Sequence, residues 1–182
     1  GLIQIVLVGL FSGIIALLAA NLGPINPTAL VVIGLLLAIV PSAVWLVFFY
    51  RQDRLEPEPK TSIAQVFLLA LILTDVFALR LFNDWFKLAN WAPAETFTSL
   101  LANILIVGFT IAGIVYVAVR LPVYATPEFD ERMDGIVYGT VAGLGVATLL
   151  NLHYVLDNGG VALGPGVIHV TTTALAQASF GG

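Results

Sequence analysis

The chain has 182 residues, of which 59% are hydrophobic and only 10% are charged. A soluble domain carries about 25% charged residues, so this composition excludes a water-covered surface and indicates lipid as the solvent. The net charge of −4 excludes a basic nucleic-acid-binding surface, and the absence of cysteine excludes disulfides, thiolate metal sites and a cysteine nucleophile.

Long apolar segments run through the whole chain and predict one transmembrane domain, residues 1–182. They cover residues 2–20, 29–50, 61–82, 97–119, 135–156 and 167–180. About 20 helical residues cross a hydrocarbon core of about 30 Å. The expected fold is therefore all-α and integral to the membrane, a polytopic bundle of about six transmembrane helices. The last segment is short for a crossing, so we expect the natural chain to continue or this helix to end inside the bundle.

Two charged loops, residues 51–60 and 120–134, follow the second and fourth predicted spans. They contain five of the seven basic residues, and only Arg80 and Lys87 lie on the opposite side. Basic residues are retained in cytoplasmic loops, so both loops and both termini are expected on the cytoplasmic side of a prokaryotic-type cytoplasmic membrane. On the other side, aromatic residues alternate with polar ones in residues 83–96, which is typical of a segment at the lipid headgroups.

Glycines recur at every fourth position of the fifth predicted span, at Gly135, Gly139 and Gly143. This spacing places them on one helix face. Small residues let membrane helices approach closely, because lipid provides no hydrophobic force between helices. The span is therefore expected to be the central packing helix.

Three sequence motifs indicate a family. The first charged loop reads R-x-D-R-x-E-P-E-P, and the second reads P-E-F-D-E followed by D-G-I-V-Y-G, with G-L-G-V-A further on. The loop positions concerned are Arg51, Asp53, Arg54, Glu56, Glu58, Glu128, Asp130 and Asp134. In these motifs the chain resembles the PrsW-like intramembrane proteases, relatives of the CaaX-processing membrane proteases.

The resemblance breaks at the family's acidic residues. Where the family carries E-E-x-x-K, this chain has Ile111, Ala112 and Val115. Where the family carries E-N-x-x-Y, the chain keeps Asn151 and Tyr154 but has leucine in place of the glutamate, and His169 matches the family's following histidine.

Peptide hydrolysis in a membrane needs a water activated by a base or a metal, and the family's carboxylates would serve that purpose. Their replacement predicts a pseudoprotease without catalytic residues. Such a protein would act as a structural or accessory subunit of a larger membrane complex, in contact with lipid and with other membrane subunits.

Three interpretations remain open for the polar residues inside the spans. The first is a cluster satisfied internally, with Asp75 bonded to His169 or Asn151. The second is a zinc site formed by His153, His169 and Asp75, with three protein ligands and one open position. The third is axial ligation of a tetrapyrrole by His153 or His169.

Two alternatives to the accessory-subunit hypothesis follow from the same residues. One is an active intramembrane protease in which His169, His153 and Asp75 perform the chemistry. The other is a transporter or channel component, which is disfavoured because the interior holds few charges and the chain shows no paired inverted half.

Overall fold

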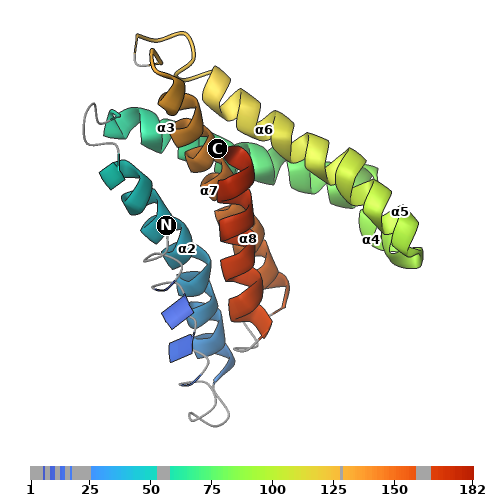
Figure 1. Cartoon of the computed structure of the whole chain (residues 1–182). Coiled ribbons are helices and arrows are strands. Elements are labelled where there is room, and N and C mark those ends of the chain that lie inside the picture. Colours follow the sequence, from blue (N-terminus) through green and yellow to red (C-terminus); the bar gives the residue numbers. More distant parts are fainter. Residues whose placement is uncertain are drawn as a thin grey trace.

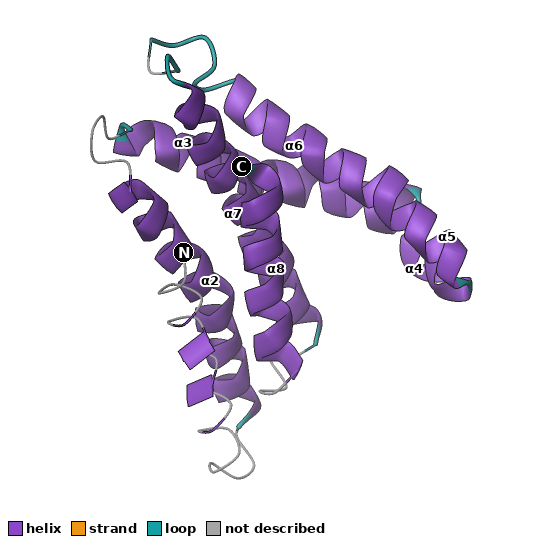
Figure 2. Ribbon diagram, in the orientation of Figure 1, coloured by secondary structure: helices purple, strands orange, loops and turns teal. Residues whose placement is uncertain are grey.

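The structure is a computed structural model that describes residues 26–52, 58–127, 129–158 and 165–182, with Val6, Gly9, Leu10, Gly13, Ile14 and Leu17 of the N-terminal segment. Helices make up nearly all of this part, and it contains no strand (Figure 2). The elements in chain order are α2 (Pro27–Gln52), α3 (Lys60–Leu73), η1 (Thr74–Leu79), η2 (Leu81–Trp85), α4 (Leu88–Trp91), η3 (Ala92–Ala94), α5 (Thr96–Leu101), η4 (Ala102–Gly108), α6 (Phe109–Arg120), α7 (Arg132–Asp157) and α8 (Pro165–Gly181).

The prediction of an all-α integral membrane protein is confirmed. Within the described residues, four helical segments are long and apolar enough to cross a membrane: Thr28–Val47, Lys60–Ala94, Thr96–Arg120 and Met133–Asp157. The number of about six spans is not confirmed. The predicted span of residues 2–20 lies largely outside the described residues, and α8 has 17 residues.

Helix α7 is the centre of the bundle and contacts α2, α3, α6 and α8 (Figure 1). Of the 18 consecutive residues of α7 with the highest hydropathy, 78% are buried. The corresponding value for the helical segment Thr96–Arg120 is 11%. The helix begins with a reciprocal cap, in which the backbone N–H of Glu131 donates to Asp134 Oδ2 at 2.8 Å. Small residues along α7 allow these close approaches, because little side-chain volume separates the backbones.

The glycines of α7 lie against three different neighbours. Gly139 and Gly143 face the backbone of α8 so closely that an added Cβ would lie under 3.0 Å from a carbonyl oxygen of α8. Gly145 faces the backbone of α3 in the same way, whereas Gly135 lies near the Phe129 ring, 3.7 Å from where its Cβ would be. The four-residue spacing therefore places two of the three predicted glycines at one helix contact.

A projecting arm, defined as η1 through η4 (residues 74–108), extends away from the bundle (Figure 1). Its segments η1, η2 and η4 are π-helical, a wide form that occurs often at functional sites. At the tip, Trp91 Nε1 donates to the Phe86 carbonyl at 2.7 Å and Lys87 adopts a left-handed conformation. Many of the arm's apolar side chains are exposed, as expected of a surface in contact with lipid.

The two charged loops meet the bundle at one end. Tyr138 Oη of α7 donates to Glu58 Oε2 at 2.5 Å, and both residues are buried. Asp130 is exposed, and Arg51 belongs to the last turn of α2. The predicted motif residues Asp53, Arg54, Glu56 and Glu128 lie outside the described residues.

Candidate functional site

Asp75 and His153 form an ion pair between two membrane segments of the described chain. Asp75 lies in η1, and His153 lies in the last two turns of α7. His153 Nε2 is 3.2 Å from Asp75 Oδ1, although the two residues are 78 positions apart in the sequence. The sequence predicts a partner for Asp75 on another helix but names His169 or Asn151, whereas the structure provides His153.

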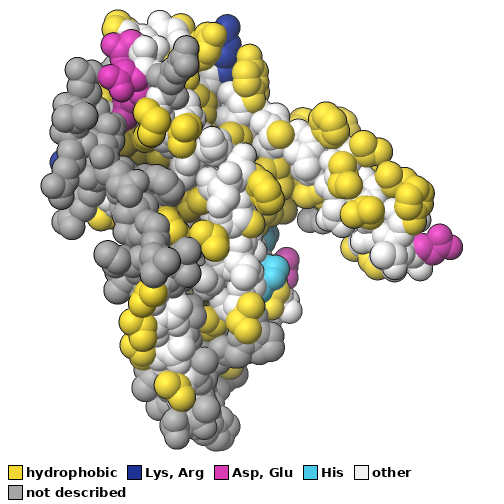
Figure 3. Space-filling view, viewed as in Figure 1, with side chains coloured by type: hydrophobic (Ala, Val, Ile, Leu, Met, Phe, Trp, Pro, Cys, Tyr) yellow, Lys and Arg dark blue, Asp and Glu magenta, His cyan; other side chains and the backbone are white. Residues whose placement is uncertain are grey.

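The geometry of this pair allows proton transfer. An ionised carboxylate only accepts hydrogen bonds, so His153 donates Nε2–H to Asp75. In that tautomer Nδ1 carries a lone pair and can take a proton from a water molecule. The side chains are 38% and 54% exposed for His153 and Asp75, so the described residues do not enclose the pair. Figure 3 shows histidine and acidic side chains together on the bundle surface below the projecting arm.

A second pair lies next to the first along α7. The Tyr154 ring stacks on the His169 ring of α8, with centroids 4.1 Å apart and an interplanar angle of 24°. This contact joins the C-terminal end of α7 to the N-terminal end of α8. The stacking brings together Tyr154 and His169, two of the three residues that the sequence analysis matched to the family pattern. It does not place His169 in a hydrogen bond with Asp75.

The third of these residues, Asn151, is fully buried between the same two helices. Its Nδ2 donates to the Val170 carbonyl at 3.0 Å, which ties α7 to α8. Its Oδ1 has no hydrogen-bond partner within the described residues. A buried amide oxygen without a partner costs about 1–3 kcal/mol, so this atom marks a position where a bound water would stabilise the fold.

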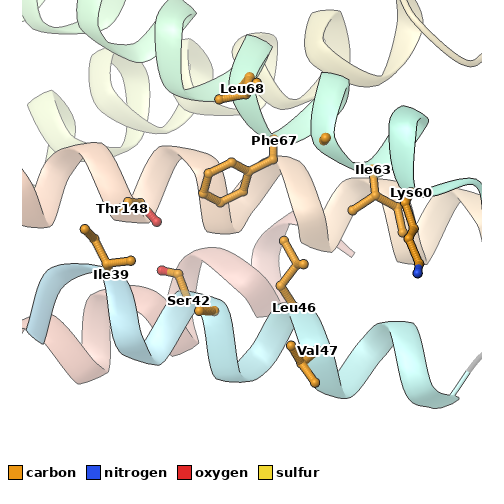
Figure 4. A pocket seen from close by; sticks show the side chains of 11 residues that line it. Ile39, Ser42, Leu46, Val47, Lys60, Ile63, Phe67, Leu68 and Thr148 are labelled. Carbon is orange, nitrogen blue, oxygen red and sulfur yellow. The ribbon is translucent and has the colours of Figure 1, made fainter. Parts of the chain in front are cut away.

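Two cavities flank the bundle, and neither is lined by Asp75 or His153. One, of about 440 Å³, lies between η4, α6 and α8 and contains the positions matched to the family's acidic motif, Ile111, Ala112 and Val115. The other, of about 660 Å³, lies between α2, α3 and α7 (Figure 4). Its walls are apolar, and Lys60 extends along one end of it.

Within residues 26–52, 58–127, 129–158 and 165–182, the side chains do not gather into a metal site with three protein ligands. Zinc centres of that kind use three His, Cys, Asp or Glu ligands and keep one open position. No group of three such residues that could hold a metal ion occurs in the part of the chain that the structure describes. Asp75 and His153 form a two-residue set, and His169 stacks on a tyrosine instead of joining them. Tetrapyrrole ligation by His153 or His169 stays an untested prediction.

Comparison with known proteins decides the family. Residues 58–180 match the model of a family described as "PrsW family intramembrane metalloprotease". The chain belongs to the PrsW family. The resemblance predicted from the loop motifs is thereby confirmed.

Similar PrsW proteins occur in several bacteria. The chain is 31% identical to Protease PrsW of Bacillus subtilis over 121 residues, which are 66% of this chain and 53% of that protein. It is also 31% identical to Protease PrsW of Geobacillus kaustophilus over 144 residues, 79% of this chain and 61% of that protein. The chain thus spans a little over half the length of these relatives. No solved structure matches it.

These comparisons contradict the prediction of a pseudoprotease serving as an accessory subunit. The PrsW family is described as proteases, and the relatives are each named as one. Nothing positive in the structure supports a non-catalytic protein. The prediction was wrong because it ranked the replacement of the family's acidic residues above the family membership itself; the alternative of an active intramembrane protease agrees better with the comparisons.

Sequence analysis also missed one polar residue of the 440 Å³ cavity. Gln177 lines this cavity from α8, together with Asn103 from η4. A glutamine inside an apolar membrane helix could have indicated this polar position, because polar side chains in membrane helices usually face other helices or a cavity.

Proposed function

We propose that this chain contains the membrane-embedded core of an intramembrane protease. The family match over residues 58–180 carries the proposal. The Asp75–His153 pair supports it chemically. An ionisable residue inside the membrane costs about 2.5–3.5 kcal/mol on insertion scales, and such residues are usually functional.

In the proposed reaction His153 acts as the general base. Nδ1 takes a proton from water while the hydroxide oxygen attacks the peptide carbonyl carbon, and Asp75 stabilises the imidazolium through Nε2–H. The protonated His153 then returns the proton to the departing amine as the C–N bond breaks. Water is consumed, and a new carboxylate and a new amine are formed. No step is assigned to a metal, because the described residues do not gather three ligands.

We further propose the orientation predicted from the basic residues. With loops 51–60 and 120–134 in the cytoplasm, Asp75 lies about 22 Å along the helix from Lys60. The reacting pair would then act on a peptide bond in the non-cytoplasmic half of the bilayer. This orientation and the location in a prokaryotic-type cytoplasmic membrane rest on the charge distribution of the loops.

The test uses the full chain purified in mild detergent and reconstituted into liposomes with fluorescent single-span peptides. We expect cleavage by the wild type and a loss of about 10²–10⁴-fold in His153→Gln and Asp75→Asn, the range of a lost general base. Asp84→Asn is the matched control, because Asp84 is an exposed aspartate further along the same arm. Equal cleavage by His153→Gln and wild type would reject the assigned base, and no cleavage of any peptide by the wild type would reject the proposed function.

Association with other membrane proteins is a separate expectation. The mass of the detergent-solubilised particle, measured by light scattering, tests it. A particle holding one chain and no other protein would reject it without affecting the protease proposal.

A further inference from the structure

Two cavities follow the same helical edge of the projecting arm. The first, of about 440 Å³, runs along η4 and α6 and is closed by α8. The second, of about 490 Å³, lies along α5 near the tip of the arm. Asn103 lines both cavities, so they adjoin at this residue.

The 440 Å³ cavity contains two side-chain amides, Asn103 and Gln177, whereas Glu95, Thr96 and Ser99 line the 490 Å³ cavity. Asn103 Nδ2 donates to the Ser99 carbonyl of its own helix at 2.8 Å, which leaves its Oδ1 available as an acceptor. Gln177 lines the same 440 Å³ cavity from α8. Together the two side chains present both donor and acceptor groups in the 440 Å³ cavity.

The position of Gln177 is fixed by the packing of α8 on α7. Its backbone carbonyl lies against Gly143, at a distance that a side chain on residue 143 would not permit. Gln177 also lines the 440 Å³ cavity, so a change in the packing of α8 on α7 would move this amide relative to the cavity wall.

We propose that these two cavities bind an unwound segment of the transmembrane substrate, with Asn103 and Gln177 bonding its exposed peptide groups. The inference rests on the proposed proteolysis. A helical substrate hides its peptide groups, so it must unwind before water can attack one of them. Unpaired N–H and C=O groups are costly in lipid, and side-chain amides at membrane depth offset that cost.

The dimensions agree with an extended segment. The lining residues run from the start of α5 to Tyr116 of α6, about 30 Å of helix. An extended peptide rises about 3.3 Å per residue, so about nine residues fit along this edge. Each cavity also lies within the range of about 300–1,000 Å³ typical of binding sites.

Binding is tested separately from cleavage by photo-crosslinking. A benzophenone amino acid replaces Val107, which lines the 440 Å³ cavity. In a control protein it replaces Val47, which lines the 660 Å³ cavity between α2, α3 and α7. A labelled single-span peptide is offered to the inactive His153→Gln protein in liposomes. We expect crosslinks at position 107 and few at position 47. Crosslinking at position 47 alone would overturn the inference.

Amide variants provide the second readout. Asn103→Leu and Gln177→Leu are expected to weaken peptide binding by about 2- to 10-fold each, the value of one hydrogen bond, and to raise KM more than they lower kcat. Asn83→Leu is the control, because Asn83 is an exposed amide in η2 that lines neither cavity.

The outcomes separate the two proposals. Crosslinking at position 107 without cleavage by the wild type supports the binding site and rejects the protease. Cleavage with an unchanged KM in both leucine variants rejects the binding site and leaves the protease standing. Neither binding nor cleavage rejects both.

Discussion

Replacing Gly143 with alanine is expected to separate α8 from α7. The new Cβ would lie under 3.0 Å from the backbone carbonyl of Gln177. Backbone atoms of a packed helix cannot rotate away as a flexible side chain does, so α8 itself must move. Gly113 of α6 is the matched control, because a Cβ there meets nothing within 4 Å.

The magnitude follows from two opposing effects. Alanine favours a helix over glycine by about 1 kcal/mol, and this gain applies to both variants. Overpacking a tight contact costs about 1–3 kcal/mol, and this cost applies only to Gly143→Ala. The propensity gain cancels in the comparison. The free energy of unfolding of Gly143→Ala should therefore lie about 1–3 kcal/mol below that of Gly113→Ala.

The assay is unfolding of the purified protein by SDS titration in mixed micelles, followed by far-ultraviolet circular dichroism. The comparison is the difference in unfolding free energy between the two variants. If Gly143→Ala is as stable as Gly113→Ala, the close contact between α7 and α8 is not present in the membrane protein. The same variant should also weaken peptide binding, because displacement of α8 carries Gln177 away from the cavity.

Two further predictions concern the charged loops. Tyr138→Phe removes the hydrogen bond to the buried Glu58 and should lower the unfolding free energy by about 1–3 kcal/mol. Tyr116→Phe, at an exposed site, is the control and should leave the unfolding free energy unchanged. Equal unfolding free energies for the two variants would contradict a stabilising role for the hydrogen bond. Because these 182 residues contain no cysteine, single cysteines introduced at Asp130 and Asn90 report topology. A membrane-impermeant maleimide should label position 130 only from the cytoplasmic side and position 90 only from the opposite side, and the reverse pattern would invert the proposed orientation.

The membrane fold could be read from the sequence because it follows from composition. Few charges and long apolar runs leave helices as the available structure, since lipid satisfies no backbone group. The number of spans could not be confirmed in the same way. Residues 2–20 lie largely outside the described part, and the segment of residues 61–82 continues as π-helix into the arm instead of ending at a membrane face.

The candidate site was only partly predictable. Asp75, His153 and His169 were recognisable as one candidate group, because ionisable residues are rare inside membrane helices; the direct contact of Asp75 with His153, without His169, was not. Their pairing depends on how η1 crosses α7, which no local pattern records across 78 positions. The sequence analysis assigned no site to Gln177, since its place at a cavity wall depends on the packing of α8 on α7.

Incorporation of ¹⁸O from labelled water tests the central claim most directly. Wild-type protein in liposomes is incubated with a single-span peptide in H₂¹⁸O, and the masses of the products are measured by mass spectrometry. Hydrolysis assisted by His153 and Asp75 predicts one ¹⁸O in the new carboxylate within the membrane segment, with product lost in His153→Gln and Asp75→Asn. Labelled product formed at the wild-type rate by both variants, or an intact peptide with the wild type, would contradict the account.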